Sequence, residues 1–186
     1  NYYFFLLQFF QLFFLKYTNY FKAWGPYQEM KPSDWEKVFE ILINKNACLT
    51  VGITASWVNK DNSIVPFPDK FPDQADLLKQ ASSKNLIEIA NHGLTHCVVG
   101  KHLPRLISSN RKYHREFWDW IPREIHFEHL EKSQEIFSNW IGEKPVTLIP
   151  PGNVYSADTL EAAEKYGIKI INSYMNHNIE SRVKIV

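Results

Sequence analysis

The sequence predicts an α/β fold in which parallel strands alternate with helices. Short apolar runs rich in β-branched residues are typical of buried strands, and longer amphipathic runs between them are typical of helices. Strands are expected at residues 47–54, 86–90, 146–149 and 168–172, and helices from Ser33 onward and at 74–83, 123–140 and 157–166. Such alternation indicates parallel βαβ units. An open sheet and a closed barrel both fit this pattern.

Local signals set the expected boundaries of these elements. Ser33 followed by Glu36 has the form of a capping box, so the first helix should begin there. Gly167 follows the last helix as a left-handed cap. The three prolines in residues 61–73 predict a loop without regular structure. Residues 98–122 form a long connection whose aromatic and arginine content predicts order.

Composition excludes some classes of function. A chain of 186 residues is long enough for one domain with its own core. A net charge of +1 without a basic block gives no indication of binding to nucleic acid or to an anionic membrane surface. Aromatic residues make up 15% of the chain, which suits a carbohydrate-facing groove or a large core, with core packing favoured. Two cysteines leave the cellular compartment open.

The N-terminal segment, residues 1–15, is apolar from position 2 onward except for Gln8 and Gln11. It is shorter than the roughly 20 residues that a membrane-spanning helix needs, so we expect no clear membrane span. It has neither a basic leader nor a small-residue cleavage site. We therefore expect an internal piece of a larger gene product or a diverged first strand, with a degraded secretion signal as the alternative. Residues 16–186 are then expected to form one partial domain.

Two histidines, His92 and His96, follow the strand at 86–90 directly. Their spacing allows two imidazole nitrogens to bind one metal ion, and α/β folds place their sites at the carboxyl ends of strands. A helical zinc-protease motif is excluded because Gly93 stands where that motif requires Glu. The alternative is a buried, hydrogen-bonded histidine pair without a ligand.

The segment EIANHGLTH resembles the histidine motif of the NodB-type polysaccharide deacetylases (carbohydrate esterase family 4), Asn-His-(Ser/Thr)-x-x-His. The matching residues are Asn91, His92, Thr95 and His96. Gly93 stands where the family has Ser or Thr. LIPPGNVY at 148–155 resembles the family's later proline-rich active-site loop, in the PP-x-N form of an uncharacterised deacetylase-like branch.

This resemblance implies a fold and an activity. The fold is an irregular (β/α) barrel of the NodB/polysaccharide deacetylase type, incomplete at one or both ends because the family's last motifs are not in the chain. The activity is metal-dependent removal of N- or O-linked acetyl groups, with a carbohydrate or other acylated small molecule as substrate. The family holds its divalent ion, for which we expect zinc, with Asp-His-His. A neighbouring Asp acts as the base.

The Asp-Asp pair that the family carries on its first strand is absent from this chain before the histidine motif. In the best positional match, Thr18 replaces the Asp that acts as the base, and Asn19 replaces the Asp that binds the metal ion. Asn offers a neutral oxygen to a cation, and Thr cannot act as a general base at neutral pH. The alternatives are therefore a catalytically inactive relative that keeps the fold and weak ligand binding, or an ordinary loop at these residues.

Further site residues are expected from the later motifs. The substrate-binding rim is assigned to Pro150, Pro151, Gly152 and Asn153. Asn153 could bond the acyl group, although turn chemistry alone explains Pro-Gly-Asn. The family's loop usually carries an Arg, and neither Leu148 nor Ile149 can replace it.

The remaining polar and aromatic candidates divide between chemistry and packing. Arg115-Glu116-Phe117 resembles a Ser-Glu-Phe patch of the same branch, which makes Glu116 a candidate catalytic acid or ligand, with a solvated or salt-bridged side chain as the alternative. Thr95 is expected to orient the loop. His126 and His129 are expected on the surface of their helix. Packing is favoured over sugar stacking for Trp57, Trp118 and Trp120.

Overall fold

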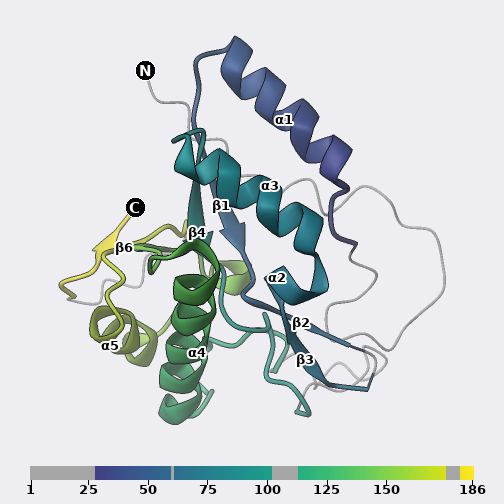
Figure 1. Cartoon of the computed structure of the whole chain (residues 1–186). Coiled ribbons are helices and arrows are strands. Elements are labelled where there is room, and N and C mark those ends of the chain that lie inside the picture. Colours follow the sequence, from purple (N-terminus) through teal and green to yellow (C-terminus); the bar gives the residue numbers. More distant parts are fainter. Residues whose placement is uncertain (1–27, 60, 102–112, 175–180) are drawn as a thin grey trace.

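A computed structural model describes residues 28–59, 61–101, 113–174 and 181–186, and these form an α/β unit built on a parallel sheet (Figure 1). The sheet strands are β1 (Leu49–Ile53), β4 (Ile87–Asn91), β5 (Thr147–Leu148), β6 (Ile170–Ile171) and β7 (Lys184–Ile185). They follow the order β1-β4-β5-β6-β7, and every neighbouring pair is parallel. The α/β prediction is confirmed. Within the described residues, β1 and β7 are the sheet edges and the barrel is not closed.

The helices are α1 (Pro32–Asn44), α2 (Phe67–Lys70), α3 (Pro72–Ser83), α4 (Arg123–Ile141) and α5 (Ala157–Lys165). The predicted helices at 74–83, 123–140 and 157–166 are confirmed with small shifts of their ends. Gly142 ends α4 in a left-handed conformation, and Gly167 has φ +87 after α5, as its cap prediction requires. At its other end, α5 is capped by a reciprocal pair, Ser156 and Thr159.

The predicted start of the first helix is wrong. Helix α1 begins at Pro32, and its N-cap, Lys31, makes no hydrogen bond through its side chain. Proline suits the first helical position because its φ is already helical and the N–H it lacks would have no partner there. Ser33 therefore lies inside the helix, and no capping box forms with Glu36.

The loop predicted for residues 61–73 is also wrong. Strand β2 (Ser56–Val58) pairs antiparallel with β3 (Ile64–Pro66), and α2 and α3 follow at once. Each proline occupies a position that tolerates a missing N–H: Pro66 ends a strand, Pro68 lies in the first turn of α2, and Pro72 opens α3. Another unpredicted element is β7, which pairs with β6 and so extends the sheet beyond the last predicted strand.

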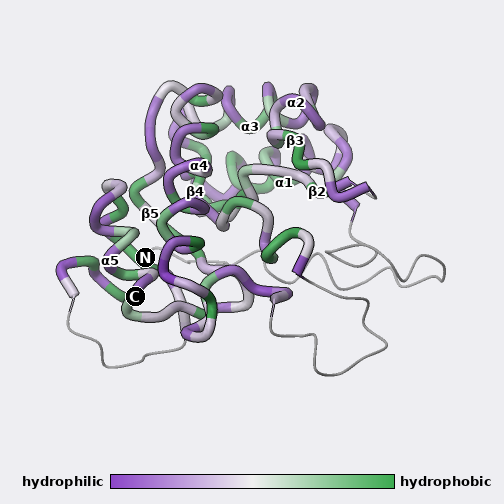
Figure 2. Tube along the Cα trace, turned by 90° about the horizontal axis from the view of Figure 1, so that it is seen from below, coloured by the Kyte–Doolittle hydropathy of each residue, from purple (hydrophilic) through white to green (hydrophobic). Residues whose placement is uncertain are grey.

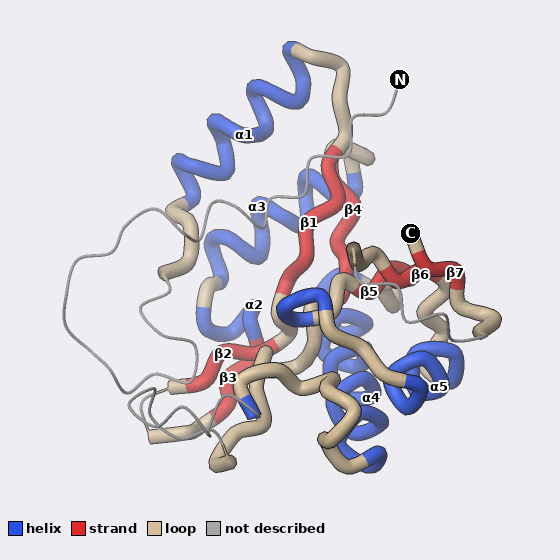
Figure 3. Tube along the Cα trace, turned by 180° about the vertical axis from the view of Figure 1, so that it is seen from behind, coloured by secondary structure: helices blue, strands red, loops and turns tan. Residues whose placement is uncertain are grey.

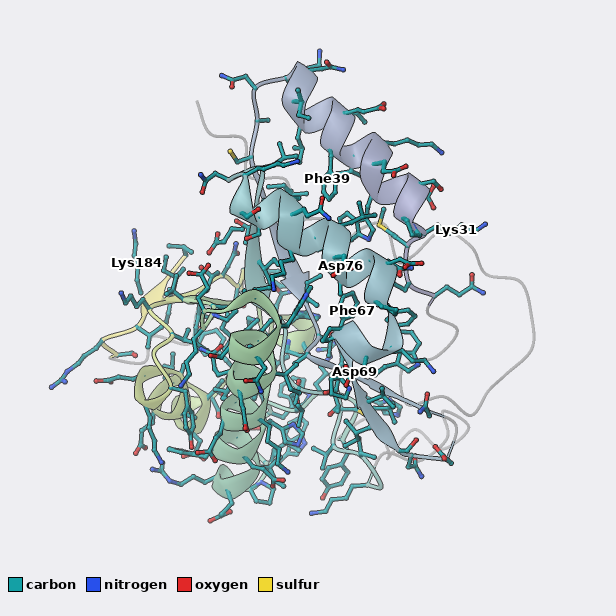
Figure 4. The ribbon with its side chains drawn as sticks, in the orientation of Figure 1. Lys31, Phe39, Phe67, Asp69, Asp76 and Lys184 are labelled. Carbon is teal, nitrogen blue, oxygen red and sulfur yellow. The ribbon has the colours of Figure 1, made fainter. Side chains whose placement is uncertain are left out.

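Helices cover one face of the sheet. The inward residues of β1 and β4 pack with α1, α3 and the end of α4, whereas Leu148 and Ile171 pack with α5. Figure 3 shows β1 and β4 side by side with β5, β6 and β7 beyond them. Hydrophilic and hydrophobic residues alternate along α3 and α4 (Figure 2), as helices with one buried face require. Phe39 lies on the side of α1 nearest α3 (Figure 4). The ring centroids of Phe67 and Trp140 are 5.3 Å apart.

Strand register brings the two sequence motifs to the same edge of the sheet. Ile53 pairs with Asn91, and Asn91 pairs with Leu148. The backbone bonds continue past the strand ends, from His92 N to Ile53 O at 2.8 Å and from Ile149 N to Asn91 O at 2.9 Å. The histidine motif and the proline-rich loop therefore leave the sheet side by side.

The predicted apolar segment 1–15 and the two residues Thr18 and Asn19 lie outside the described residues. Among the helices that are described, none has the length and apolar character needed to cross a bilayer.

Candidate metal centre

The rings of His92 and His96 lie together at the carboxyl end of β4, with centroids 5.3 Å apart and planes inclined by 58°. Two imidazoles that share a tetrahedral ion, with each nitrogen about 2.0–2.1 Å from it, have centroids roughly 5 Å apart. The observed spacing therefore suits one shared ion. His96 has φ +63, a conformation that L-residues rarely adopt, and this backbone turn brings its ring beside that of His92.

A backbone hydrogen bond selects the tautomer of the His92 ring. His92 Nδ1 lies 2.6 Å from the carbonyl oxygen of Ile149, and because a carbonyl can only accept, Nδ1 carries the proton. The His96 ring bonds the backbone of His114. A metal-binding histidine commonly donates its second ring N–H in this way, which leaves the first nitrogen with a free lone pair.

Burial favours the neutral form of both imidazoles. It is the main cause that lowers the pKa of His92, against the opposing effects of Ile149 and Glu116. Burial, followed by the neighbouring His92, lowers the pKa of His96 to about 3. Neutral imidazoles are the form that binds a metal ion, so the electrostatics of the pair suit a cation. Within the described ranges, no group of three His, Cys, Asp or Glu residues could hold a metal ion. A third protein ligand from those residue types is therefore absent from the described part.

The proline-rich loop packs against the histidine loop. A Cβ placed on Gly93 would lie 3.2 Å from Cγ of Pro151, so the proline ring lies close to the backbone of Gly93. Pro151 opens a short 3₁₀ turn, η3 (Pro151–Asn153). Gly152 takes φ +63 there, and a side chain on it would overlap the guanidinium of Arg115. Arg115 thus brings a cation to this loop from another segment, a contact that the sequence did not predict.

The structure places the four predicted rim residues at the site with unequal exposure. Pro150, Pro151 and Asn153 are buried, and Gly152 is half-buried. Asn153 has φ +61, and its carbonyl accepts the hydroxyl of Ser173 at 2.9 Å. Turn geometry accounts for these features, and substrate binding by the four residues stays a prediction.

Glu116 lies beneath the histidine loop with no exposed surface. Its Oε2 accepts the backbone N–H groups of Leu94 and Thr95 at 3.2 and 3.4 Å, and its Oε1 accepts that of His96 at 3.1 Å. Nδ1 of His129 also bonds Oε2. A catalytic or ligand role for Glu116 stays a prediction. Of the two alternatives, a solvated side chain is wrong, whereas a side chain paired with a basic residue agrees with the His129 contact.

Gly93 and Glu116 fit one another. Gly93 has φ +83, and a Cβ there would overlap Oε1 of Glu116. The carboxylate therefore occupies the space that a side chain at this position would need. This explains physically why glycine stands where the resembled motif has Ser or Thr.

Two neighbouring side chains hold the histidine loop in place. Asn91 is fully buried, accepts the N–H of Gly93 at 2.7 Å and donates to Ser133 at 2.8 Å. Thr95 donates to the carbonyl of Cys97 at 2.7 Å, which agrees with the expected orienting role.

The surface prediction for His126 and His129 is wrong. His126 is 0% exposed and His129 is 7% exposed. Both positions extend the buried face of α4 towards its N-terminus, because they lie four residues before the buried Leu130 and Ser133 respectively. Helical periodicity therefore contained this information, and the polarity of the histidines concealed it.

The fully buried His126 leads to a pH prediction. Its ring bonds the carbonyl of Ile121 and the hydroxyl of Thr159, and burial is the main cause that lowers its pKa. Below about pH 6.5 the unfolded chain therefore binds a proton more readily than the folded one, and His126 costs up to about 1.4 kcal/mol of stability per pH unit. We expect His126→Gln to weaken this acid dependence, as measured by urea unfolding at several pH values. An unchanged slope would contradict the assignment.

Trp118 and Trp120 stack on one another, with centroids 4.3 Å apart, and Trp120 is 45% exposed. Arg115 lies over the Trp118 ring at 5.8 Å. Trp57 packs edge-on against Phe71 at 5.0 Å. The Trp57 contact fits the packing interpretation, whereas for Trp118 and the exposed Trp120 the choice between packing and sugar stacking stays a prediction.

The chain belongs to the polysaccharide deacetylase family, because the family model described as polysaccharide deacetylase matches residues 24–171, well over half of the sequence. The predicted relationship is thereby confirmed. No curated protein sequence matches the chain.

Solved structures give the same fold. A de-N-acetylase from Aggregatibacter actinomycetemcomitans has a TM-score of 0.54 at 16% identity, over 82% of this chain and 64% of that one. The BpsB deacetylase domain from Bordetella bronchiseptica has a TM-score of 0.52 at 16% identity, over 82% and 65%. A mutant of BA3943, a family 4 pseudoenzyme from Bacillus anthracis, has a TM-score of 0.52 at 12% identity, over 77% and 41%. The chain thus spans less than two thirds of each of these structures.

Proposed function

We propose that this protein is a metal-dependent hydrolase that removes N- or O-linked acetyl groups from a glycan or a related acylated compound. The observation that carries the proposal is the paired geometry of His92 and His96. Their rings converge at a strand end, and Nδ1 of His92 bonds the carbonyl of Ile149, which leaves Nε2 of that ring for a cation. Zinc is the expected ion, because neutral imidazole nitrogens suit it well.

His92 and His96 would hold the ion, and Asn19 is the proposed third ligand. When bound, a divalent ion lowers the pKa of its water and stabilises oxyanion charge on the acyl carbonyl. The carbonyl of Ile149 fixes the orientation of the His92 ring, and the turn at Pro151 packs beside the histidine loop. Both contacts help to hold the two rings in position. Thr18 occupies the proposed base position, and a hydroxyl cannot remove a proton efficiently at neutral pH.

A second candidate function follows from those two residues. With Thr18 and Asn19 in place of the family's Asp-Asp pair, the chain would be an inactive relative that keeps the fold and binds a ligand weakly. The histidine geometry is common to both candidates. Only the strength of metal binding and the presence of a base distinguish them.

Acetate release from acetylated chito-oligosaccharides tests the proposal, with wild-type protein and the Thr18→Asp/Asn19→Asp variant each loaded with zinc. We expect slow, zinc-dependent release by the wild type. The variant should be at least about 100-fold faster, because a positioned general base contributes roughly 10²–10⁴-fold. Zinc-loaded protein that releases no acetate in either form would reject the hydrolase on this substrate class and favour the inactive relative.

A further inference from the structure

We propose that residues 93–96 form an anion-binding nest that is filled by the chain's own Glu116 carboxylate, and that Glu116 is thereby a positioning residue for the histidine pair. The nest itself follows from contacts between described residues. Its consequence for metal binding rests on the proposed function.

Three consecutive amides converge on one carboxylate. The N–H groups of Leu94, Thr95 and His96 reach the two oxygens of Glu116 over 3.1–3.4 Å. Successive amides can converge on one anion where the backbone combines left-handed and turn conformations, and such concavities bind anions. Positive φ values at Gly93 and His96 flank these amides. The anion here belongs to a residue twenty positions further along the chain.

The carboxylate offsets an otherwise unfavourable backbone. A positive φ at a residue with a Cβ, such as His96, is sterically disfavoured and persists only where surrounding contacts impose it. The bond from His96 N to Glu116 Oε1 is such a contact, and it acts on the residue whose ring meets His92. Without this bond, we expect the backbone of His96 to relax to a negative φ, which would move its ring away from that of His92.

His129 anchors the carboxylate from the opposite side. Glu116 has no exposed surface, and a buried charge must be paired or hydrogen-bonded. The Nδ1 atom of His129, on helix α4, supplies the fourth hydrogen bond. Glu116 thus connects a rigid helix to the histidine loop, with both oxygens bonded to these two elements. The loop is then ordered before any metal ion arrives.

The wild-type protein tests the nest directly after a chelator has removed any metal. We expect the amides of residues 94–96 to exchange hydrogen at least about 100-fold more slowly than in an unstructured peptide, as hydrogen-bonded amides do. Their proton resonances should shift downfield, as expected for bonds to a carboxylate. Exchange at the unstructured rate would overturn the proposal without any mutation.

Glu116→Ala tests the positioning role, with Glu135→Ala on the exposed face of α4 as the matched control. We expect the Glu116 variant to lose the amide protection and to bind Co²⁺ about 10–100-fold more weakly, the usual effect of removing an outer-shell partner. Sodium formate should restore both properties by refilling the nest, and sodium chloride at equal ionic strength should not.

A folded Glu116→Ala variant with unchanged amide protection and Co²⁺ affinity would overturn the proposal. If that variant does not fold, the wild-type exchange experiment decides. Failure of the proposed function would be recognised separately, as a wild type with protected amides that binds no Co²⁺ or releases no acetate.

Discussion

Replacing Gly93 with alanine is expected to lower the free energy of unfolding by at least about 3 kcal/mol. The new Cβ would overlap the carboxylate of Glu116, and φ +83 is unfavourable for any L-residue. Because the carboxylate has no exposed surface, it can move only by breaking its bonds to the loop and to His129. Disrupting a buried charged network costs about 3–5 kcal/mol. Urea unfolding followed by tryptophan fluorescence would measure the loss.

Gly142→Ala is the matched control for this prediction. Gly142 has φ +85, almost the same as Gly93, but nothing lies within 4 Å of a Cβ placed there. Its replacement should therefore cost only the backbone strain, about 1–2 kcal/mol. Equal losses in the two variants would show that backbone strain alone explains the Gly93 effect. In the double variant Gly93→Ala/Glu116→Ala, the cost should be well below the sum of the single costs, because the overlapping group is absent.

The second large effect concerns metal binding. His92→Ala and His96→Ala should each weaken zinc affinity by at least about 100-fold, because a site that loses one of its two imidazoles keeps few strong donors. Titration against a chromophoric chelator would measure the change. His126→Gln is the matched control, since His126 is also buried but its ring bonds Ile121 and Thr159 instead. Zinc affinity that survives both His92 and His96 substitutions would place the metal elsewhere.

Local patterns were sufficient for much of the fold. Strands β1 and β4 and helix α4 carry enough periodic apolar residues to be recognised from the sequence. Strand β3 and helix α2 contradict the rule that prolines exclude regular structure, because each proline there occupies a tolerated position. Strand β2 has three residues, too few to carry a periodic signal. Strand β7 has two residues and is held by backbone bonds to β6, so its side chains carry little signal.

The candidate site also has one part that the sequence predicts and one part that it does not. His92 and His96 are four residues apart, and a local motif identifies them. The environment that shapes them is not local, because Glu116 and His129 come from positions at least twenty residues further along the chain. The one local indication of this environment is Gly93. Its departure from the resembled motif indicates that something else occupies the space of its side chain, but the sequence does not identify the occupant.

The central claim is that His92 and His96 share one metal ion, and nitrogen NMR of the imidazole rings during a zinc titration tests it most directly. We predict that one ring nitrogen of His92 and one of His96 shift together and saturate at one equivalent of zinc. Nδ1 of His92 should remain protonated, bonded to Ile149. Rings that do not respond to zinc, or that respond at different stoichiometries, would contradict the claim.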